Sequence, residues 1–444
     1  MSAPARQGDI AAELAGEARR LGLGLVDARG QFRPVPIALS PWLLDRTQWR
    51  AARRAATLLG RLVHRLAARP GLLAPPPAPA SGSAASLPSV LGARRPRQPR
   101  ARSAPLMRHD LLLDTSGQWR WVETNVTAAG MGPFGERAGW LQRAWRDRFG
   151  GPGRPAPNPA TARQARCLVE AARGADRPAR QVPRPLIVFA VEENEDNRSD
   201  QKLLQAAVEA AGATVLRLTL RELADTAATR GRRLCLPGAG CVDLVYFRTG
   251  YNIGDFATPR LLAWRLALEA HDLALCPGVD LQLAGSKWQQ MQLYRAGDAL
   301  YRRLGFSRAE TVRLRRLMVP QHALASLGAR RAERLIERGW LLKSQREGGG
   351  SVLAGEDALA ALAGQAGDSI LMAPIEARIL EQPVPVLSGE RIVTSGPRVA
   401  ELGLFTAGPP ARPAGYLVRS KPADRLEAGI HAGHGMLDGI TLAF

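Results

Sequence analysis

The sequence predicts an α/β protein that contains a parallel, doubly wound sheet. Between residues 185 and 276, short apolar runs of the kind found in buried strands alternate with helical stretches. This alternation is typical of βαβ units. The expected strands are 185–191, 213–220, 242–247 and 273–276, and the helices between them include 200–211 and 259–271. A length of 444 residues allows more than one hydrophobic core, so we expect two or three domains.

The first part of the chain is expected to be helical, with helices at 10–21 and 49–66. A segment rich in proline, alanine and arginine follows at 69–105. Because it contains few apolar residues, we expect this insert to be a loop or a disordered segment that does not pack.

A β-hairpin is expected at 108–125, immediately after the insert. Strict strand alternation would place Trp119, Trp121, Glu123 and Asn125 on one face. Carboxylate and amide oxygens are ligands that suit Mg²⁺, so Glu123 and Asn125 are candidate metal ligands. A half-exposed strand end without any ligand is the alternative.

Two strands of the expected parallel sheet end in polar residues, and ligands bind beyond the carboxyl ends of such strands. Asn197 and Gln201 follow the first strand, and Arg248 and Tyr251 follow the third. A guanidinium such as that of Arg248 can bind a substrate carboxylate through two parallel hydrogen bonds. The alternative is that Arg248 is one more surface arginine in an arginine-rich chain.

Lysine is rare in this chain, which makes the positions of its lysines informative. Of 61 basic residues only four are lysines: Lys202, Lys287, Lys343 and Lys421. A lysine that persists in such a composition is expected where a compact ammonium group is needed. Lys287 follows a serine with capping-box spacing, which places it in the first turn of a helix, where backbone N–H groups favour an anion.

The segment 341–350 combines charged residues with three consecutive glycines. Lys343, Arg346 and Glu347 stand directly before the glycines at 348–350. A loop without Cβ atoms can close over phosphates and donate backbone N–H groups to their oxygens. The two basic side chains would add positive charge, and Glu347 is a further candidate ligand for Mg²⁺. A flexible surface linker is the alternative, since glycine-rich motifs are not specific.

Composition limits the other classes of function. A net charge of +21 favours nonspecific adhesion to nucleic acid, but aromatic residues make up only 5% of the chain and no nucleic-acid-reading motif is present. Four irregularly spaced cysteines predict reduced, mostly buried thiols rather than a disulfide framework or a zinc site. The chain begins without the hydrophobic core of a signal peptide and contains no run long enough for a membrane span. We therefore expect a soluble, cytoplasmic protein.

These motifs, in this order and spacing, resemble those of the eukaryotic-type glutathione synthetases, which are ATP-grasp ligases. The resemblance extends from about residue 106 to residue 438 and is densest at 108–125, 245–251, 276–290, 341–355 and 417–438. It implies an ATP-grasp core with an inserted Rossmann-like α/β substrate-binding domain, and a homodimer. The implied boundaries are 1–160 for the N-terminal helices, the insert and the hairpin, 161–285 for the inserted domain, and 286–444 for the ATP-grasp domain with its glycine-rich loop.

The resemblance also implies a role for each matching residue. The implied Mg²⁺ ligands are Glu123, Asn125 and Glu347. The implied ATP-binding residues are Lys287, Lys343, Gly348, Gly349, Gly350, Met372, Ile375, Glu401, Lys421 and Glu427. The implied residues for γ-glutamylcysteine and for the acceptor are Arg108, Asn197, Gln201, Arg248, Tyr251, Arg419, Ile430 and His431. Arg346 and Arg419 are expected to stabilise the negative charge that develops during catalysis.

The expected activity is therefore the ATP-dependent ligation of γ-glutamylcysteine to glycine through an acyl phosphate. The chain departs from the family pattern on the substrate side, where it has Ala128 and Gly130 in place of a Ser-x-Ser pair and His431 in place of a small residue. Two alternatives stay open on this basis. One is the same chemistry on a different dipeptide or acceptor. The other is a nucleic-acid-binding or catalytically inactive protein.

Overall fold

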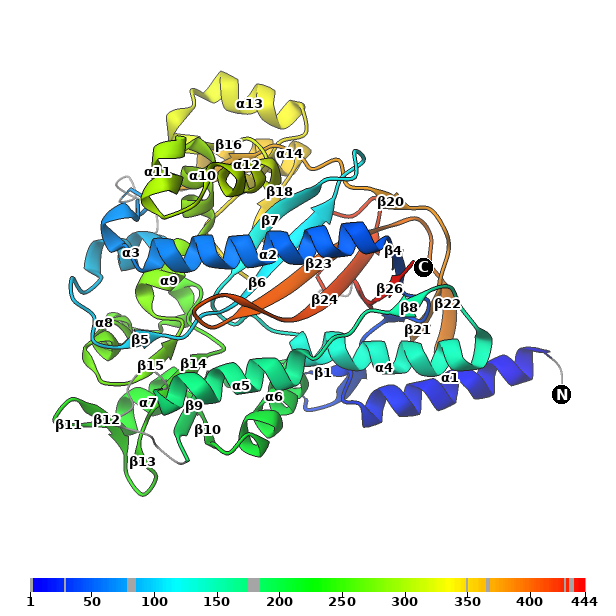
Figure 1. The fold of residues 1–444 in the computed structure, drawn as a ribbon, viewed down its shortest axis with the longest axis horizontal. Coiled ribbons are helices and arrows are strands. Elements are labelled where there is room, and N and C mark those ends of the chain that lie inside the picture. The colour runs from blue at the N-terminus through cyan, green and yellow to red at the C-terminus, as the bar shows by residue number, and fades with distance from the viewer. Residues whose placement is uncertain are drawn as a thin grey trace.

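The computed structural model describes residues 3–27, 29–77, 85–174, 184–348, 350–364, 368–426, 429–430 and 435–443. Its largest element is a nine-stranded sheet with the order β22-β21-β3-β25-β24-β23-β6-β7, in which β20 also pairs with β23 (Figure 1). Its strands are β3 (Ile37–Ala38), β6 (Leu106–Leu113), β7 (Trp119–Asn125), β20 (Ile379–Leu380), β21 (Pro385–Ser388), β22 (Arg391–Thr394), β23 (Arg398–Ala407), β24 (Arg412–Pro422) and β25 (Met436–Asp438). All pairs in this sheet are antiparallel except that of β25 with β3.

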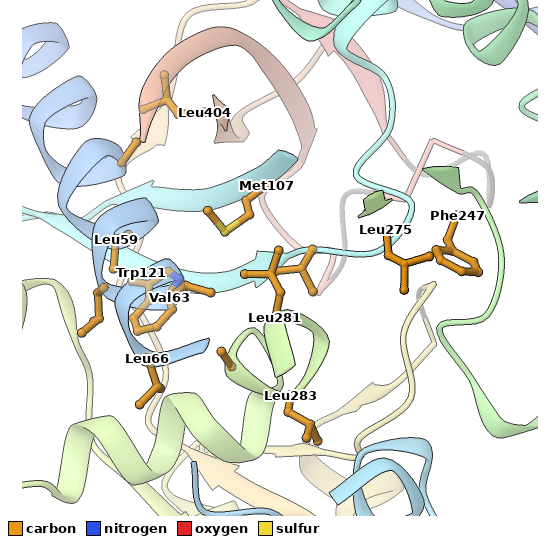
Figure 2. Packing of buried hydrophobic residues seen from close by; sticks show 14 of the residues in the cluster. Leu59, Val63, Leu66, Met107, Trp121, Phe247, Leu275, Leu281, Leu283 and Leu404 are labelled. Atoms are coloured by element: carbon orange, nitrogen blue, oxygen red, sulfur yellow. The ribbon is translucent and has the colours of Figure 1, made fainter. Parts of the chain in front are cut away.

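Long helices cover one face of the nine-stranded sheet (Figure 1). They are α2 (Arg46–Ala67), α4 (Gly132–Phe149) and α5 (Ala160–Arg173), and α1 (Ala3–Arg20) lies beside α4. Helix α2 begins at Asp45, whose carboxylate accepts hydrogen bonds from the backbone N–H groups of Thr47 and Gln48. One stripe of α2 packs on alternate residues of the strands, so that Leu59 and Val63 share a core with Met107 and Leu404 (Figure 2). The opposite face of these strands carries charged residues instead.

A bulge in β7 corrects the predicted alternation of the hairpin. Asp110 pairs with Glu123, whereas Leu111 pairs with Trp121, so Val122 is the extra residue. The tryptophans therefore stay in the core under α2, and Glu123 turns to the charged face. The prediction that Trp119, Trp121, Glu123 and Asn125 share one face was wrong for this reason.

The predicted parallel sheet is present, with the strand order β10-β9-β14-β15-β5 and every pair parallel. Its strands are β5 (Arg102–Ser103), β9 (Leu186–Val191), β10 (Thr214–Thr219), β14 (Leu244–Phe247) and β15 (Ala274–Cys276), and its helices include α6 (Arg198–Ala210), α7 (Leu220–Thr226) and α8 (Pro259–Ala267). All residues of β9 are buried, as expected for a central strand with both faces covered. The α/β fold class is confirmed, whereas the exact domain boundaries stay a prediction.

A smaller antiparallel sheet with the order β16-β19-β17-β18 carries the glycine segment. It is built from β16 (Gln321–Ala323), β17 (Leu341–Lys343), β18 (Val352–Leu353) and β19 (Ile370–Met372), and α13 (Ala329–Glu337) and α14 (Gly355–Ala361) pack on it. Four short helices lead to it: α9 (Val279–Ala284), α10 (Lys287–Arg295), α11 (Asp298–Arg303) and α12 (Arg308–Leu317).

The remaining strands form three small sheets. They are β1 (Gly24–Val26) with β2 (Phe32–Pro34), β11 (Ala228–Arg230) with β12 (Arg233–Leu236) and β13 (Gly240–Cys241), and β4 (Trp42–Leu44) with β26 (Ile440–Leu442) and β8 (Arg154–Pro155).

The insert at 69–105 is more ordered than its composition predicts. Ser86 caps helix α3 (Leu87–Arg94), and Leu87 and Leu91 are buried in the main core. The end of the insert forms β5, the edge strand of the parallel sheet. Two well-placed leucines are enough to anchor α3, so the prediction of a segment that does not pack was wrong for these residues. Residues 78–84 lie outside the described residues.

The cysteines also differ in part from expectation. Cys167 and Cys276 are free and buried, as predicted, but Cys235 and Cys241 form a disulfide between neighbouring strands β12 and β13. The two cysteines are six positions apart in the sequence, and the hairpin register brings them opposite each other.

Buried His109 predicts a specific dependence of stability on pH. Its ring nitrogens contact the hydroxyls of Thr124 and Thr406 at 2.8 and 2.9 Å, and burial lowers its pKa from 6.5 to about 3. The folded state therefore holds the neutral ring, and its stability contribution is complete above pH 6.5 and is lost as the pH falls toward 3. Between pH 6 and 5, we expect His109 alone to lower the free energy of unfolding by about 1.2 kcal/mol.

Denaturant titrations at several pH values, on the wild type and on His109→Gln, measure this contribution. The variant should show a shallower dependence on pH in this range. The difference isolates His109, because the other titrating groups, including His64, are common to both proteins. Equal slopes would contradict a neutral buried ring.

Candidate active site

A cavity of about 730 Å³ lies against the charged face of the nine-stranded sheet. Its walls come from β6, β7, β23 and β24, from the glycine segment after β17, and from the loops that follow β9 and β14 of the parallel sheet. Three regions far apart in the sequence thus meet around one space. The predicted site residues that line it are Arg108, Glu123, Asn125, Asn197, Arg248, Tyr251, Lys287, Lys343, Glu347, Gly348, Gly350, Met372, Ile375, Glu401, Arg419 and Lys421.

Two lysines and two glutamates form the charged centre of this cavity. The Nζ atom of Lys287 lies 2.7 Å from Oε1 of Glu347 and 3.9 Å from Oε2 of Glu123, and Nζ of Lys343 lies 3.7 Å from the same atom of Glu123. Both lysine side chains are almost completely buried. The hairpin and the glycine segment are therefore joined through Lys287, at the start of α10.

The electrostatics differ between the two glutamates. Burial raises the pKa of Glu123, but the positive charges of Lys287, Lys343 and two arginines outweigh burial and lower it to about 2. Burial raises the pKa of Glu347, and the neighbouring charge of Glu123 adds to this effect. Burial also lowers the pKa of Lys343. The lysines are almost completely buried and the glutamates are half-buried, so water solvates these charges only in part, which favours the binding of a further charged ligand.

Asp110 organises the neighbouring part of the sheet. It is buried, and its two carboxylate oxygens accept hydrogen bonds from Nε and Nη2 of Arg108 at 2.7 and 2.8 Å. The Nδ2 atom of Asn125 also donates to Asp110 at 2.9 Å, and Arg419 lies 3.4 Å away. Arg419 forms a further ion pair with Glu401, its partner across β23 and β24. Because the amide nitrogen of Asn125 is bound to Asp110, the amide oxygen points away from Asp110 and has no part in this contact.

The opposite wall carries polar groups from the parallel sheet. Arg248 is buried, and its Nη1 atom donates to the hydroxyl of Tyr246 at 3.3 Å. Burial would lower the pKa of Arg248, but Tyr246 and nearby carboxylates outweigh burial and raise it. A Cβ atom at Gly130 would lie 2.6 Å from Nη2 of Arg248. Arg248 therefore occupies the space that a side chain at position 130 would need.

Several buried polar atoms around this wall have no hydrogen-bond partner among the described residues. They are Oγ1 of Thr127, Oδ1 of Asn197, Nε2 of Gln201, Nη1 of Arg217 and Nε of Arg248. Unpaired buried polar atoms are rare in folded proteins and cost about 1–3 kcal/mol each. Their concentration here is consistent with a polar ligand that completes the hydrogen bonding.

Asn252 attaches the glycine segment to the parallel sheet. Its Oδ1 atom accepts from the backbone N–H of Glu347 at 2.8 Å, and its Nδ2 atom donates to the carbonyl of Glu347 at 3.0 Å. Gly348 follows with a φ of +94°, and a Cβ atom there would lie 3.3 Å from the ring of Tyr251. Position 348 therefore requires glycine both for its backbone conformation and for the space it leaves.

Some predicted residues lie elsewhere. The side chain of Arg346 is exposed and does not line the cavity, although its carbonyl accepts a hydrogen bond from Lys287 at 2.8 Å. Gln201 and Ile430 are buried behind the wall rather than in it. Gly349, Glu427 and His431 lie outside the described residues.

Sequence reasoning missed several residues that shape the site. Asp110 follows Arg108 at a spacing of two on one strand, so alternation could have identified it. The carbonyl of Val122, at the bulge, accepts from Lys343 and from Gln290, and no sequence pattern marks a bulge. Arg217 donates to Oε1 of Gln201 at 2.7 Å, a contact that depends on the register of β10 and on the position of α6.

The residues present fit a hard divalent cation. Glu123, Glu347 and the amide group of Asn125 line the same cavity, and all three offer oxygen atoms as metal ligands. The ammonium group of Lys287 lies 2.7 Å from Glu347 and 3.9 Å from Glu123, so it now holds the two carboxylates that would bind the cation. Groups of three or more histidine, cysteine, aspartate or glutamate residues that could bind a metal ion are absent from the described part of the chain. A cation here would therefore need further oxygens from a ligand such as a phosphate.

Comparisons with known proteins find sequence similarity to glutathione synthetases. Residues 185–284 match the family model described as eukaryotic glutathione synthase. The chain is 28% identical over 280 residues to a chloroplastic glutathione synthetase from Arabidopsis thaliana, which covers 59% of this chain and 50% of that protein. It is 31% identical over 278 residues to a glutathione synthetase from Homo sapiens, which covers 58% of this chain and 56% of that protein. The chain thus spans about half the length of the curated relatives it matches.

The fold is shared along the whole chain with a solved structure of a glutathione synthetase-like effector from Globodera pallida. The TM-score is 0.71 at 14% sequence identity, and the match covers 100% of this chain and 98% of that one. Within the described residues, no helix is both long and apolar enough to cross a membrane. The predicted resemblance is confirmed: this chain is similar to the eukaryotic-type glutathione synthetases in sequence, and it shares the fold of a glutathione synthetase-like protein.

Proposed function

We propose that the protein is an ATP- and Mg²⁺-dependent ligase that forms glutathione from γ-glutamylcysteine and glycine. The observation that carries this proposal is the meeting of Glu123, Lys287, Lys343 and Glu347 at the junction of the hairpin and the glycine segment. Such a centre combines buried ammonium groups for phosphate oxygens with carboxylates for a cation. The matches to curated glutathione synthetases support the choice of reaction.

In the proposed reaction, the substrate carboxylate attacks the γ-phosphorus of ATP to give an acyl phosphate and ADP. The amine of the acceptor then attacks the acyl carbon, and phosphate leaves. A bound Mg²⁺, held by Glu123, Asn125 and Glu347, would neutralise phosphate charge during the transfer.

The protein's own residues would position the reactants and stabilise charge. Lys287 and Lys343, both within 4 Å of Glu123, would bind phosphate oxygens. Arg419, held by Asp110 and Glu401, would face the negative charge of the reacting carboxylate. Arg346, beside Glu347 on the glycine segment, stays a prediction for the same role.

Arg248 and Asn197 would bind the dipeptide at the far wall, where the unpaired polar atoms lie, and Gln201 stays a prediction for the same role. The glycine segment, attached to this wall by Asn252, would cover the phosphates and exclude water from the acyl phosphate. A homodimer and a cytoplasmic location stay predictions of the resemblance.

A second candidate is the same chemistry on another dipeptide or acceptor. Ala128 and Gly130 provide no hydroxyl, and Arg248 occupies the space beside Gly130. An assay of ADP release over a panel of γ-glutamyl dipeptides and small amino acids separates the two. The first proposal predicts the highest kcat/KM for γ-glutamylcysteine with glycine, and a clear preference for another pair would replace it with the second.

The glycine segment gives a prediction for Gly348→Ala. A methyl group would strain a backbone with φ +94° and press on Tyr251 at 3.3 Å. We expect a cost of about 1–3 kcal/mol in closing the segment, which corresponds to a loss of about 5–150-fold in kcat/KM for ATP. Initial-rate kinetics measure it. Gly254→Ala is the matched control, because Gly254 has no heavy atom within 4 Å of the added Cβ atom and should retain full activity. Equal rates for the two variants would contradict the assigned role of the segment.

A further inference from the structure

A second large cavity, of about 810 Å³, shares no lining residue with the candidate active site. It lies where the tip of the β23–β24 hairpin reaches between α2 and α5 (Figure 1). Small residues of the hairpin tip and of the segment before β6 form much of its wall, and the lack of bulk there leaves the space open. The volume is in the range of sites that bind nucleotide-sized ligands.

Arginines from four segments converge on this cavity. They are Arg53 on α2, Arg102 on β5, Arg163 and Arg166 on α5, and Arg412 on β24. Among the described residues that line the cavity, Glu170 is the acidic one. The chain has 61 basic and 40 acidic residues, so five arginines would on average accompany about three acidic residues. The cavity is therefore more positive than the arginine-rich composition alone explains.

Two of these arginines are fixed by the backbone. Arg102 donates to the carbonyl of Ala171 at 3.1 Å, at the end of α5, and Arg163 donates to the carbonyl of Pro413 at 3.0 Å. These bonds orient the two guanidinium groups at the cavity. Hydrogen bonds to the backbone thus fix two of the five arginine side chains that line the cavity.

The other three have their charges uncompensated by the surrounding protein. In the described part of the chain, Arg53, Arg166 and Arg412 form no ion pair; Arg53 contacts the ring of Trp49 at 5.9 Å. The three side chains are exposed, so water screens their mutual repulsion, and a multivalent anion that contacts them together would replace this screening. Guanidinium groups bind phosphate through two parallel hydrogen bonds, which suits an oligophosphate chain that contacts three arginines from different segments.

We propose that this second cavity binds a small polyphosphorylated anion, through the guanidinium groups of Arg53, Arg166 and Arg412. The site is separate from the candidate active site and does not depend on the proposed ligase activity. The shared chemistry is the oligophosphate chain, which inorganic polyphosphate or a nucleoside triphosphate can supply.

Calorimetric titration of the full chain with inorganic tripolyphosphate, and in parallel with UTP, tests this proposal at a fixed salt concentration. The wild type should show a binding event at the second cavity, whether or not the candidate active site also binds the ligand. In Arg166→Gln/Arg412→Gln, this event should weaken at least about tenfold, since each lost charged hydrogen bond weakens binding by that order. ADP formation measured without tripolyphosphate should be unchanged in this variant. Tighter binding of tripolyphosphate would identify an inorganic ligand, and tighter binding of UTP a nucleotide; both support the shared chemistry.

The matched control is Arg330→Gln/Arg334→Gln, which removes the same charge from exposed positions on α13. The control should retain the binding seen in the wild type. If it loses as much affinity as the cavity variant, or if the cavity variant binds as tightly as the wild type, the site does not exist as proposed. Arg53→Gln gives an independent measurement should the double variant not fold, and wild-type affinity in this single variant would overturn the assignment of Arg53.

Discussion

Replacing Glu347 with glutamine should reduce ADP formation by about 10²–10³-fold while leaving the protein folded. The substitution keeps the shape of the side chain but removes a negative charge that lies 2.7 Å from Lys287. It takes one anionic oxygen ligand from the proposed cation and leaves Lys287 with Glu123 at 3.9 Å as its nearest carboxylate. Loss of one electrostatic contact to the reacting groups typically has an effect of this size.

Steady-state ADP release and thermal unfolding together measure this effect. Glu356→Gln, an exposed residue of α14 on the same small sheet, is the matched control and should behave as the wild type. ADP release in Glu347→Gln within threefold of the wild-type rate would remove Glu347 from the phosphate-binding centre.

Replacing Asp110 with asparagine should destabilise the protein by about 3–5 kcal/mol and abolish activity. Asp110 is 1% exposed and accepts two hydrogen bonds from Arg108 and one from Asn125. Asparagine would leave the buried guanidinium of Arg108 without a counter-charge and direct an NH₂ group at it. Removal of one partner of a buried ion pair has a cost of this order because the other charge remains buried.

A double variant separates stability from function in this network. Arg108→Met/Asp110→Leu replaces the pair with apolar side chains and should recover most of the lost free energy of unfolding. It should not recover activity, because Arg108 lines the substrate cavity and Asn125 loses its acceptor. Denaturant unfolding and ADP release are the two measurements. A destabilisation below 1 kcal/mol in Asp110→Asn would show that the network does not support the sheet.

The parallel sheet could be predicted because each of its strands is a short apolar run with its own boundaries. β9 and β14 lie within one or two residues of the predicted ranges. The convergence of Glu123 with Glu347 could also be expected, since both carboxylates were predicted to bind Mg²⁺ and the neighbouring lysines to bind phosphate. In both cases a short stretch of sequence carries the signal: an apolar run for each strand, and charged residues next to glycines for the site.

Other features depend on register and packing, which the sequence does not display. The bulge at Val122 turns Glu123 away from Trp121, and a single extra residue leaves no trace in an alternating pattern. The pairing of Cys235 with Cys241 follows from hairpin register, and α3 is held by two leucines within a proline-rich insert. The side chain of Arg346 is exposed, which the sequence could not predict either, because a charged residue beside a glycine loop can point into the cavity or into solvent.

The most direct measurement is an anomalous diffraction map of crystals grown with Mn²⁺ and a non-hydrolysable ATP analogue. The proposed mechanism predicts a manganese peak within about 2.0–2.3 Å of carboxylate oxygens from both Glu123 and Glu347, beside the analogue's phosphates. A peak bound by only one of these two regions, or phosphates placed away from Lys287 and Lys343, would contradict it.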